Sequence, residues 1–166
     1  LKQMGANISL ENQAMAGGEP VADIRIQASV LKGIHIPEDQ VPLAIDEFPA
    51  IFIAAACAEG QTILTGAAEL RVKESDRIQV MADGLIALGI NCTPTPDGMI
   101  IEGKGQAGEF PAVFGSAVIE CHHDHRIAMS FAVASLVAEG STKIKDETCV
   151  NISYPTFFRD LSNLTR

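Results

Sequence analysis

Two short stretches of the sequence crowd charged side chains where a helix is expected to begin. Residues 71–77 read Arg-Val-Lys-Glu-Ser-Asp-Arg, and residues 123–129 read His-Asp-His-Arg-Ile-Ala-Met. The first turn of a helix exposes unpaired amide donors and the positive end of the helix dipole, so it favours phosphate or carboxylate groups. Arginine can hold such groups through two parallel hydrogen bonds. We therefore interpret Arg77 and Arg126 as clamps for a small, doubly anionic molecule.

The other charged residues near these helix starts admit two interpretations. In the functional one, Lys73 and Glu74 face the reacting atoms of the bound molecule. In the alternative one, charged residues in a first helical turn are solvated or cap their own helix, and Ser75 or Asp76 could do so without any ligand. The pair Asp46-Glu47 is open to the same alternative, because an acid at a helix start is ordinary capping. Pattern alone favours capping over a ligand site.

Four potential metal ligands lie close together, namely Cys121, His122, His123 and His125. Adjacent residues on a strand point to opposite faces, so at most two of these four could bind one ion. No second pair of ligands has a suitable spacing for zinc. We expect no metal site, and elemental analysis of purified protein would test the alternative of a metal-binding scaffold.

The composition describes a globular, acidic chain. With 166 residues and 47% apolar content it can bury one core, and its net charge of −9 opposes binding to nucleic acid or to an anionic membrane. Its four cysteines are widely spaced and form no Cys-x-x-Cys pair, which favours reduced thiols in the cytoplasm. No apolar run reaches the roughly 20 residues of a membrane helix, and the sequence shows no pattern of an amino-terminal signal segment, so neither is expected.

Hydrophobic periodicity predicts strands and helices in alternation, which indicates an α/β fold. Residues 6–10 and 22–28 are predicted to form a hairpin through the turn at residues 17–20. Further strands are predicted at residues 61–65, 91–95, 99–102 and 141–144, with a glycine-rich loop after residue 102. Helices are predicted at residues 48–58, about 74–88 and about 124–138, and from near Pro155. Ile78, Met81, Leu85 and Leu88 are expected to form the inner face of the second helix.

The sequence contains an internal repeat. Residues 58–62 read Ala-Glu-Gly-Gln-Thr and residues 138–142 read Ala-Glu-Gly-Ser-Thr, each time between an alanine-rich helix and a strand. The offset is 138 minus 58, or 80 residues, and it places Asp46 opposite Arg126 and Glu74 opposite Tyr154. The order of elements on both sides matches, so the chain is predicted to repeat a β-α-β-α-β-β unit.

Four motifs closely resemble those of the 5-enolpyruvylshikimate-3-phosphate synthases (3-phosphoshikimate 1-carboxyvinyltransferases). They are Gly-Gly-Glu-Pro-Val-Ala-Asp at 17–23, Ile-Asp-Glu-Phe-Pro at 45–49, Leu-Arg-Val-Lys-Glu-Ser-Asp-Arg at 70–77 and Asp-His-Arg-Ile-Ala-Met-Ser at 124–130. The resemblance covers essentially the whole chain. The related family that transfers enolpyruvyl to a UDP-amino sugar shares the fold but lacks the Asp-His-Arg string.

The resemblance implies an α/β fold of the inside-out barrel type, in a two-lobed enzyme whose lobes each contain three repeated units. The chain would then be a single carboxy-terminal lobe covering residues 1–166. It would hold a partial first repeat at about 1–43, a second at about 44–122 and a third at about 123–166. Its partner would be a missing amino-terminal lobe of the same polypeptide, and the chain alone is expected to be inactive.

The resemblance also implies what the site binds. Arg77 and Arg126 match arginines that bind phosphoenolpyruvate, and Lys73 matches a lysine near both phosphoenolpyruvate and shikimate 3-phosphate. Asp46 matches the aspartate that contacts the hydroxyl groups of shikimate 3-phosphate. The position of a further phosphoenolpyruvate-binding lysine falls at or near Ile152, so that contact is expected to be absent here.

The implied reaction requires two proton transfers, one from the attacking hydroxyl and one to a carbon of phosphoenolpyruvate. The 5-hydroxyl of shikimate 3-phosphate attacks carbon 2 of phosphoenolpyruvate while carbon 3 is protonated, and phosphate then leaves. Asp46 is implied to take the hydroxyl proton, Glu74 to move a proton to the methylene carbon, and Lys73 to lie beside both, with Asp124 and His125 as neighbours of the site. No metal or organic cofactor is required.

Two further expectations complete this interpretation. The Ile-Asp-Glu-Phe-Pro form at residues 45–49 resembles the glyphosate-tolerant branch of the family, which predicts reduced glyphosate sensitivity. A non-catalytic module that binds small anions is the alternative to an enzyme lobe.

Overall fold

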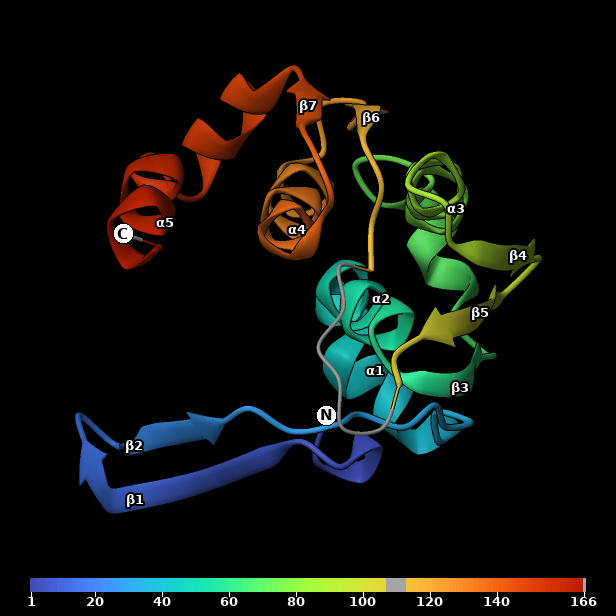
Figure 1. Ribbon diagram of the computed structural model, residues 1–166. Coiled ribbons are helices and arrows are strands. Elements are labelled where there is room, and N and C mark those ends of the chain that lie inside the picture. Colours follow the sequence, from blue (N-terminus) through green and yellow to red (C-terminus); the bar gives the residue numbers. More distant parts are fainter. Residues whose placement is uncertain (107–112, 166) are drawn as a thin grey trace.

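The computed structural model describes residues 1–106 and 113–165. Helices and small sheets alternate along the chain, which confirms the predicted α/β class (Figure 1). After the short 3-10 helix η1 (Lys2–Met4), strands β1 (Asn7–Ala16) and β2 (Glu19–Gln27) form an antiparallel hairpin. Gly17 and Gly18 join them with positive φ angles of 61° and 89°, a conformation that glycine adopts without strain. The predicted hairpin is therefore confirmed, and it is longer than expected.

The hairpin extends away from the rest of the molecule and has two unlike faces (Figure 1). Ile8 lies opposite Ile26 and Leu10 opposite Ile24, so these four apolar side chains share one face. Polar pairs such as Asn7 with Gln27 share the other. Within the described part of the chain, Leu10, Ile24 and Ile26 remain exposed.

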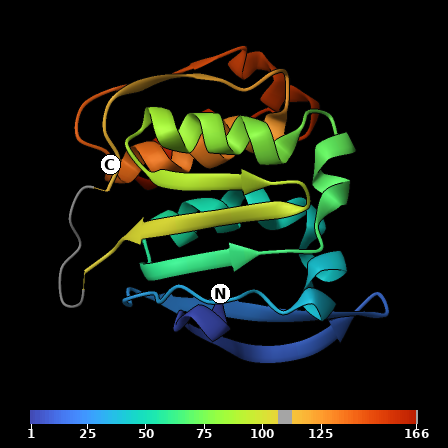
Figure 2. The same cartoon turned by 90° about the vertical axis from the view of Figure 1, so that its right-hand side faces the viewer.

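The next unit begins with short helical turns that lead into a buried helix. These are η2 (Glu38–Gln40), α1 (Val41–Ala44), η3 (Ile45–Glu47) and α2 (Phe48–Ala56). The unit continues through β3 (Glu59–Leu64), η4 (Ala68–Val72), α3 (Arg77–Ala87), β4 (Asn91–Thr95) and β5 (Gly98–Lys104). The sheet is antiparallel in the order β3-β5-β4, and Figure 2 shows it beneath α3 and in front of α2.

The last unit repeats part of this arrangement. It contains β6 (Ala117–Glu120), α4 (His125–Ala134), η5 (Ser135–Val137), β7 (Thr142–Lys145), η6 (Glu147–Ile152) and α5 (Phe157–Leu164). Strand β6 precedes α4 in the sequence and β7 follows it, and the two strands pair in parallel.

The geometry around the two copies of the repeated pentapeptide is alike. After α2, the amide of Glu59 donates to the carbonyl of Leu31 at 2.8 Å, and after α4 the amide of Glu139 donates to the carbonyl of Phe114 at 2.7 Å. In both copies, the segment that precedes the helix therefore runs parallel to the segment that follows it. Parallel β-bridges join His35 to Ile63 in the first copy and Phe114 to Ala138 in the second. The repeat boundaries at about residues 44 and 123 stay predictions.

Two strand-like segments were not predicted. Strand β6 lies where a glycine-rich loop was expected, and residues 31–36 pair with β3 although no strand was assigned there. Both segments are short, and they pair with residues more than 20 positions away, so no local pattern marks them. Residues 107–112 of the expected loop lie outside the described residues.

The core lies between α2, α3 and α4. The predicted inner face of α3, formed by Ile78, Met81, Leu85 and Leu88, is buried as expected. Gly84 lets α3 approach α4 closely, because a Cβ atom at this position would lie 2.3 Å from Cζ of the buried Phe131. In the part of the chain that the structure covers, no helix has the length and apolar character needed to cross a membrane.

Candidate active site

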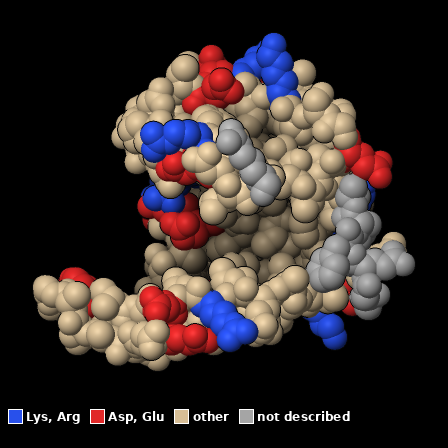
Figure 3. Space-filling model, turned by 60° about the vertical axis from the view of Figure 1, so that its left-hand side comes forward, with Lys and Arg blue, Asp and Glu red and all other residues tan. Residues whose placement is uncertain are grey.

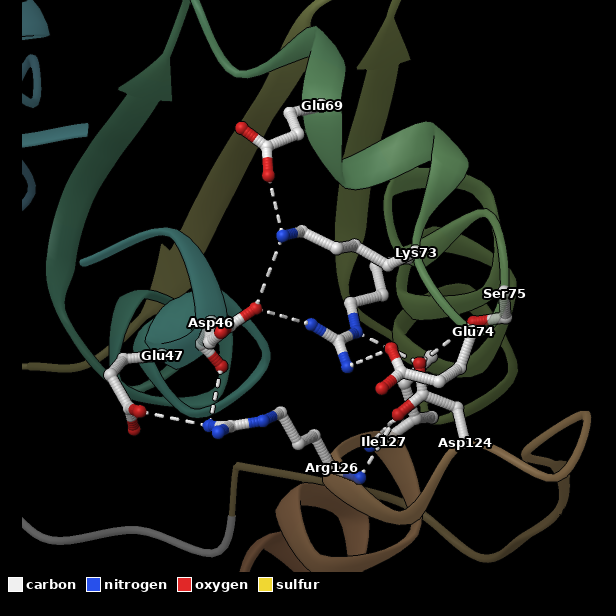
Figure 4. Close-up of polar contacts among 10 residues, drawn as sticks. Asp46, Glu47, Glu69, Lys73, Glu74, Ser75, Asp124, Arg126 and Ile127 are labelled. Carbon is white, nitrogen blue, oxygen red and sulfur yellow. Dashed lines mark hydrogen bonds and ion pairs between the residues drawn. The ribbon is translucent and has the colours of Figure 1, made fainter. Parts of the chain in front are cut away.

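Arg77 is the centre of a charged cluster at the start of α3. Its side chain is 1% exposed, yet all three guanidinium nitrogens are paired with carboxylates. Figure 4 labels the three acids, Asp46, Glu74 and Asp124. Nε donates to Oδ2 of Asp124 at 2.8 Å, one Nη to Oδ1 of Asp46 at 3.0 Å and the other Nη to Oε2 of Glu74 at 2.6 Å. Burial opposes the charge, but the three acids outweigh it and raise the pKa of Arg77. A charged arginine is therefore held inside the protein by its partners.

Asp124 connects the starts of α3 and α4. Its side chain is fully buried, and it caps α4 by accepting hydrogen bonds from the amides of Arg126 at 3.0 Å and Ile127 at 3.4 Å. Its other oxygen accepts from Arg77 and from Oγ of Ser75 at 3.0 Å. One buried carboxylate thus fixes the two predicted charged stretches relative to each other.

The capping alternative is correct for Asp76 and not for Ser75. Asp76 caps α3 by accepting from the amide of Gln79 at 3.0 Å, and it also pairs with Arg71 at 2.7 Å. Because Asp76 is the cap, α3 begins at Arg77 rather than near Glu74 as expected. Residues before Arg77 are therefore free to leave the helix axis and line the cluster.

Lys73 and Asp46 face each other across the cluster. Nζ of Lys73 lies 3.5 Å from Oδ1 of Asp46 and 2.5 Å from Oε1 of Glu69. Partial burial would raise the pKa of Asp46, but Lys73, Arg77 and Arg126 together hold this pKa below its ordinary value. The hydrogen bond to Glu69, followed by the charges of Asp46 and Glu69, raises the pKa of Lys73. Asp46 is therefore ionised and Lys73 protonated near neutral pH.

Arg126, in the first turn of α4, reaches back to the residues before α2. One Nη donates to the carbonyl oxygen of Asp46 at 2.9 Å and to Oε1 of Glu47 at 2.8 Å. Glu47 makes no side-chain cap on α2, so the capping alternative is wrong for this residue. The offset of the sequence repeat, which places Asp46 opposite Arg126, here corresponds to a direct contact.

The remaining predicted residues are less tightly engaged. His125 is half-buried at the start of α4, and its ring makes no hydrogen bond with the residues that the structure describes. Among residues 1–106 and 113–165, no three His, Cys, Asp or Glu side chains lie close enough together to bind a metal ion. Ile152 is 81% exposed, so the position of the expected missing lysine carries an apolar side chain on the surface.

A groove of about 420 Å³ between α2 and α4 opens beside the cluster. Asp46, Glu47 and Arg126 form its polar end, and apolar residues such as Ile53 and Val133 line the rest. Figure 3 shows the corresponding side of the molecule, where a largely uncharged hollow lies above the extended hairpin.

Sequence reasoning missed the roles of two residues. Glu69 binds Lys73, and the i, i+4 spacing of opposite charges was a signal that could have identified it. Ser75 binds Asp124 across 49 positions of sequence, and no local signal indicates this contact. With Glu69 and Glu47 included, the cluster has five carboxylates (Asp46, Glu47, Glu69, Glu74, Asp124) and three cations (Lys73, Arg77, Arg126), for a formal charge of −2.

The chain is similar to proteins of one family over nearly its whole length. The family model described as EPSP synthase (3-phosphoshikimate 1-carboxyvinyltransferase) matches residues 1–161. The protein named 3-phosphoshikimate 1-carboxyvinyltransferase in Hydrogenovibrio crunogenus is 60% identical over 98% of this chain, and that in Nitrosococcus oceani is 61% identical over 95%. The chain spans 35% and 34% of the lengths of these two relatives.

A solved structure shows the same fold. The EPSP synthase from Acinetobacter baumannii superposes with a TM-score of 0.95 at 66% identity, covering 99% of this chain and 37% of that one. The agreement of sequence and fold also supports the resemblance inferred from the four motifs. The chain belongs to the EPSP synthase (3-phosphoshikimate 1-carboxyvinyltransferase) family.

Proposed function

We propose that the protein carrying this chain transfers the enolpyruvyl group of phosphoenolpyruvate to the 5-hydroxyl of shikimate 3-phosphate and releases phosphate. The names of the relatives support this reaction, since they are 3-phosphoshikimate 1-carboxyvinyltransferases. In this proposal the chain contributes the phosphoenolpyruvate side of the active site, and the reaction serves the synthesis of chorismate and aromatic amino acids in the cytoplasm. The four free thiols support that compartment.

The observation that carries the proposal is the meeting of two helix starts that are far apart in the sequence. One network of hydrogen bonds and ion pairs (Figure 4) joins five of the predicted site residues, namely Asp46, Lys73, Glu74, Arg77 and Arg126. An acid, a base and cationic clamps are the groups that the proposed addition and elimination require.

The cations differ in how they can reach a substrate. The side chains of Arg126 and Lys73 are 34% and 20% exposed, so both can donate hydrogen bonds directly to the carboxylate or phosphate of phosphoenolpyruvate. Arg77 is enclosed by Asp124 on its Nε side, and its two Nη groups point toward Asp46 and Glu74. Phosphoenolpyruvate can bind Arg77 only when one of these two carboxylates gives way.

The protonation states fit the proposed proton transfers. The lowered pKa of Asp46 leaves its carboxylate free of a proton, so it can accept the proton of the attacking 5-hydroxyl. Protonated Lys73, or Glu74 after protonation, then supplies the proton that carbon 3 gains. In the elimination, the same residue, now deprotonated, takes a proton back from carbon 3 while the bond from carbon 2 to the phosphate oxygen breaks and the double bond is restored. Arg77 and Arg126 stabilise the charge that develops on the phosphate oxygens.

The charge of the cluster supports the expectation that this chain alone is inactive. Its formal charge of −2 repels two anionic substrates, so we infer that the rest of the full-length protein supplies more cations and the closure that excludes water. Detection of the enolpyruvyl product with this chain alone would contradict that inference.

The experiment that tests the function measures phosphate release and product formation by the full-length protein given both substrates. Replacing Arg126 by glutamine should lower kcat/KM by about 100-fold, because one cationic donor to the reacting phosphoenolpyruvate is lost. Arg159→Gln is the matched control, since Arg159 is exposed on α5 and pairs only with its neighbour Asp160 among the described residues. Anion binding without any turnover would instead support the non-catalytic binding module.

A further inference from the structure

The three cations of the cluster are held by two kinds of acid. Arg77 is buried and is the one cation of the cluster that binds a buried acid, Asp124, in addition to the partly exposed Asp46 and Glu74. The two cations that solvent can reach are instead paired with acids that are themselves mostly exposed. Arg126 binds Glu47, whose side chain is 65% exposed, and Lys73 binds Glu69, whose side chain is 63% exposed.

The exposed acids have no structural task that would explain their positions. Glu47 does not cap α2, and its hydrogen bond to Arg126 lies at the polar end of the groove. Glu69 lies in η4, and within the described residues its carboxylate binds only Lys73. Exposed ion pairs contribute little to stability, because water solvates the separated charges almost as well. Both acids can therefore leave their cations at low cost.

We propose that Glu47 and Glu69 are internal substitutes for the anionic groups of the substrate. In the empty site, each of these glutamates forms an ion pair with one cation. When the ligand binds, one of its phosphate or carboxylate oxygens replaces the glutamate in that pair. The acids keep the long side chains of Arg126 and Lys73 extended toward the site, and they compete with the ligand for the same donors. This inference rests on the proposed function, because it requires an anionic substrate at Arg126 and Lys73.

Loss of the buried acid should therefore weaken ligand binding, and loss of an exposed acid should strengthen it. Removing Asp124 would leave the buried Arg77 without its innermost partner and disorder the site. Among the described residues, removing the charge of Glu47 would leave Arg126 without a carboxylate, and removing that of Glu69 would leave Lys73 with Asp46 alone. Both cations already face solvent. A ligand that meets a free cation binds more tightly than one that must first displace an acid.

The test measures the Kd of phosphoenolpyruvate for the full-length protein by isothermal titration calorimetry. Glu47→Gln should lower this Kd by about 1.5-fold to fivefold, the range expected when one exposed ion pair no longer competes. Glu69→Gln should shift Kd in the same direction. Glu11→Gln is the matched control, because it removes the same charge from an exposed pair with Arg25 on the hairpin, away from the cluster, and should leave Kd unchanged.

A double-mutant cycle tests whether Glu47 weakens phosphoenolpyruvate binding through Arg126. In an Arg126→Gln background, Glu47→Gln should no longer tighten binding, because the cation for which Glu47 competes has been removed. An equal or higher Kd in Glu47→Gln than in the unaltered protein would overturn the inference while leaving the proposed function intact. Failure of the unaltered full-length protein to bind phosphoenolpyruvate would contradict the proposed function itself, and the inference with it.

Discussion

Replacing Asp124 by alanine removes the carboxylate that joins the starts of α3 and α4. Asp124 is fully buried and accepts hydrogen bonds from Arg77, Ser75 and two amides of α4. Breaking a buried ion pair by removing one partner costs about 3–5 kcal/mol, because the remaining charge loses its buried counter-charge. In Asp124→Ala, Nε of Arg77 loses its acceptor, while Asp46 and Glu74 still pair with the two Nη groups. We expect Asp124→Ala to lower the free energy of unfolding by this amount. That is a large part of the roughly 5–15 kcal/mol that stabilises a typical domain.

Two milder variants separate the charge from the hydrogen bonds. Asp124→Asn keeps an oxygen that can cap α4 but loses the charge that Arg77 requires, so it should cost about 1.5–3 kcal/mol. Ser75→Ala removes one neutral donor to Asp124 and should cost about 0.5–1.5 kcal/mol.

Urea denaturation of the full-length variants, followed by circular dichroism, measures these free energies. A loss below about 1 kcal/mol in Asp124→Ala would refute the reasoning, as would Asp124→Asn with unchanged stability. Either result would mean that Asp46 and Glu74 alone compensate the charge of Arg77, or that Arg77 reaches solvent.

Three further predictions address packing, pH dependence and inhibition. Gly84→Ala should destabilise the protein by about 1–3 kcal/mol in urea denaturation, because its Cβ would meet Phe131 at 2.3 Å, and Phe131→Leu should relieve part of this loss. Asp46 has a lowered pKa in the folded protein, so it stabilises the fold above its ordinary pKa of 3.8 and less as pH falls through the folded value. The stability of Asp46→Asn should therefore decline less than that of the unaltered protein between about pH 5 and pH 3, and parallel declines would contradict this. The resemblance of residues 45–49 to the glyphosate-tolerant branch predicts that the intact protein stays active at low micromolar glyphosate, and inhibition there would rule it out.

The elements of the fold that have strong local patterns could be predicted from the sequence. Helix α2 (Phe48–Ala56) follows from a continuous apolar, alanine-rich stretch, and the inner face of α3 follows from apolar residues at helical spacing. The hairpin follows from alternation on both sides of Gly17-Gly18. Strand β6 could not be predicted, because four residues that follow a glycine-rich segment become a strand only by pairing with β7. The end of α4 also differs from expectation, since its last turn continues as the 3-10 helix η5.

The charged stretches of the site could be located, but their pairing could not. Spacing places Lys73, Glu74 and Arg77 before or at a helix start, yet it does not indicate that Arg77 is buried. Its partners Asp46 and Asp124 lie 31 and 47 positions away, and only the packing of α2, α3 and α4 brings them together. Local reasoning therefore assigned some acids to capping that in fact bind across the site, as with Glu47.

The distance in sequence between the partners of Arg77 and Arg126 also determines when the site can form. Arg126 meets Asp46 across 80 residues, and closing so long a loop costs chain entropy that local contacts do not repay. We therefore expect the cluster to form late in folding, after α2, α3 and α4 have packed together. A ligand that binds the cluster recognises only the folded arrangement of both segments, so it should slow the proteolysis of both segments together.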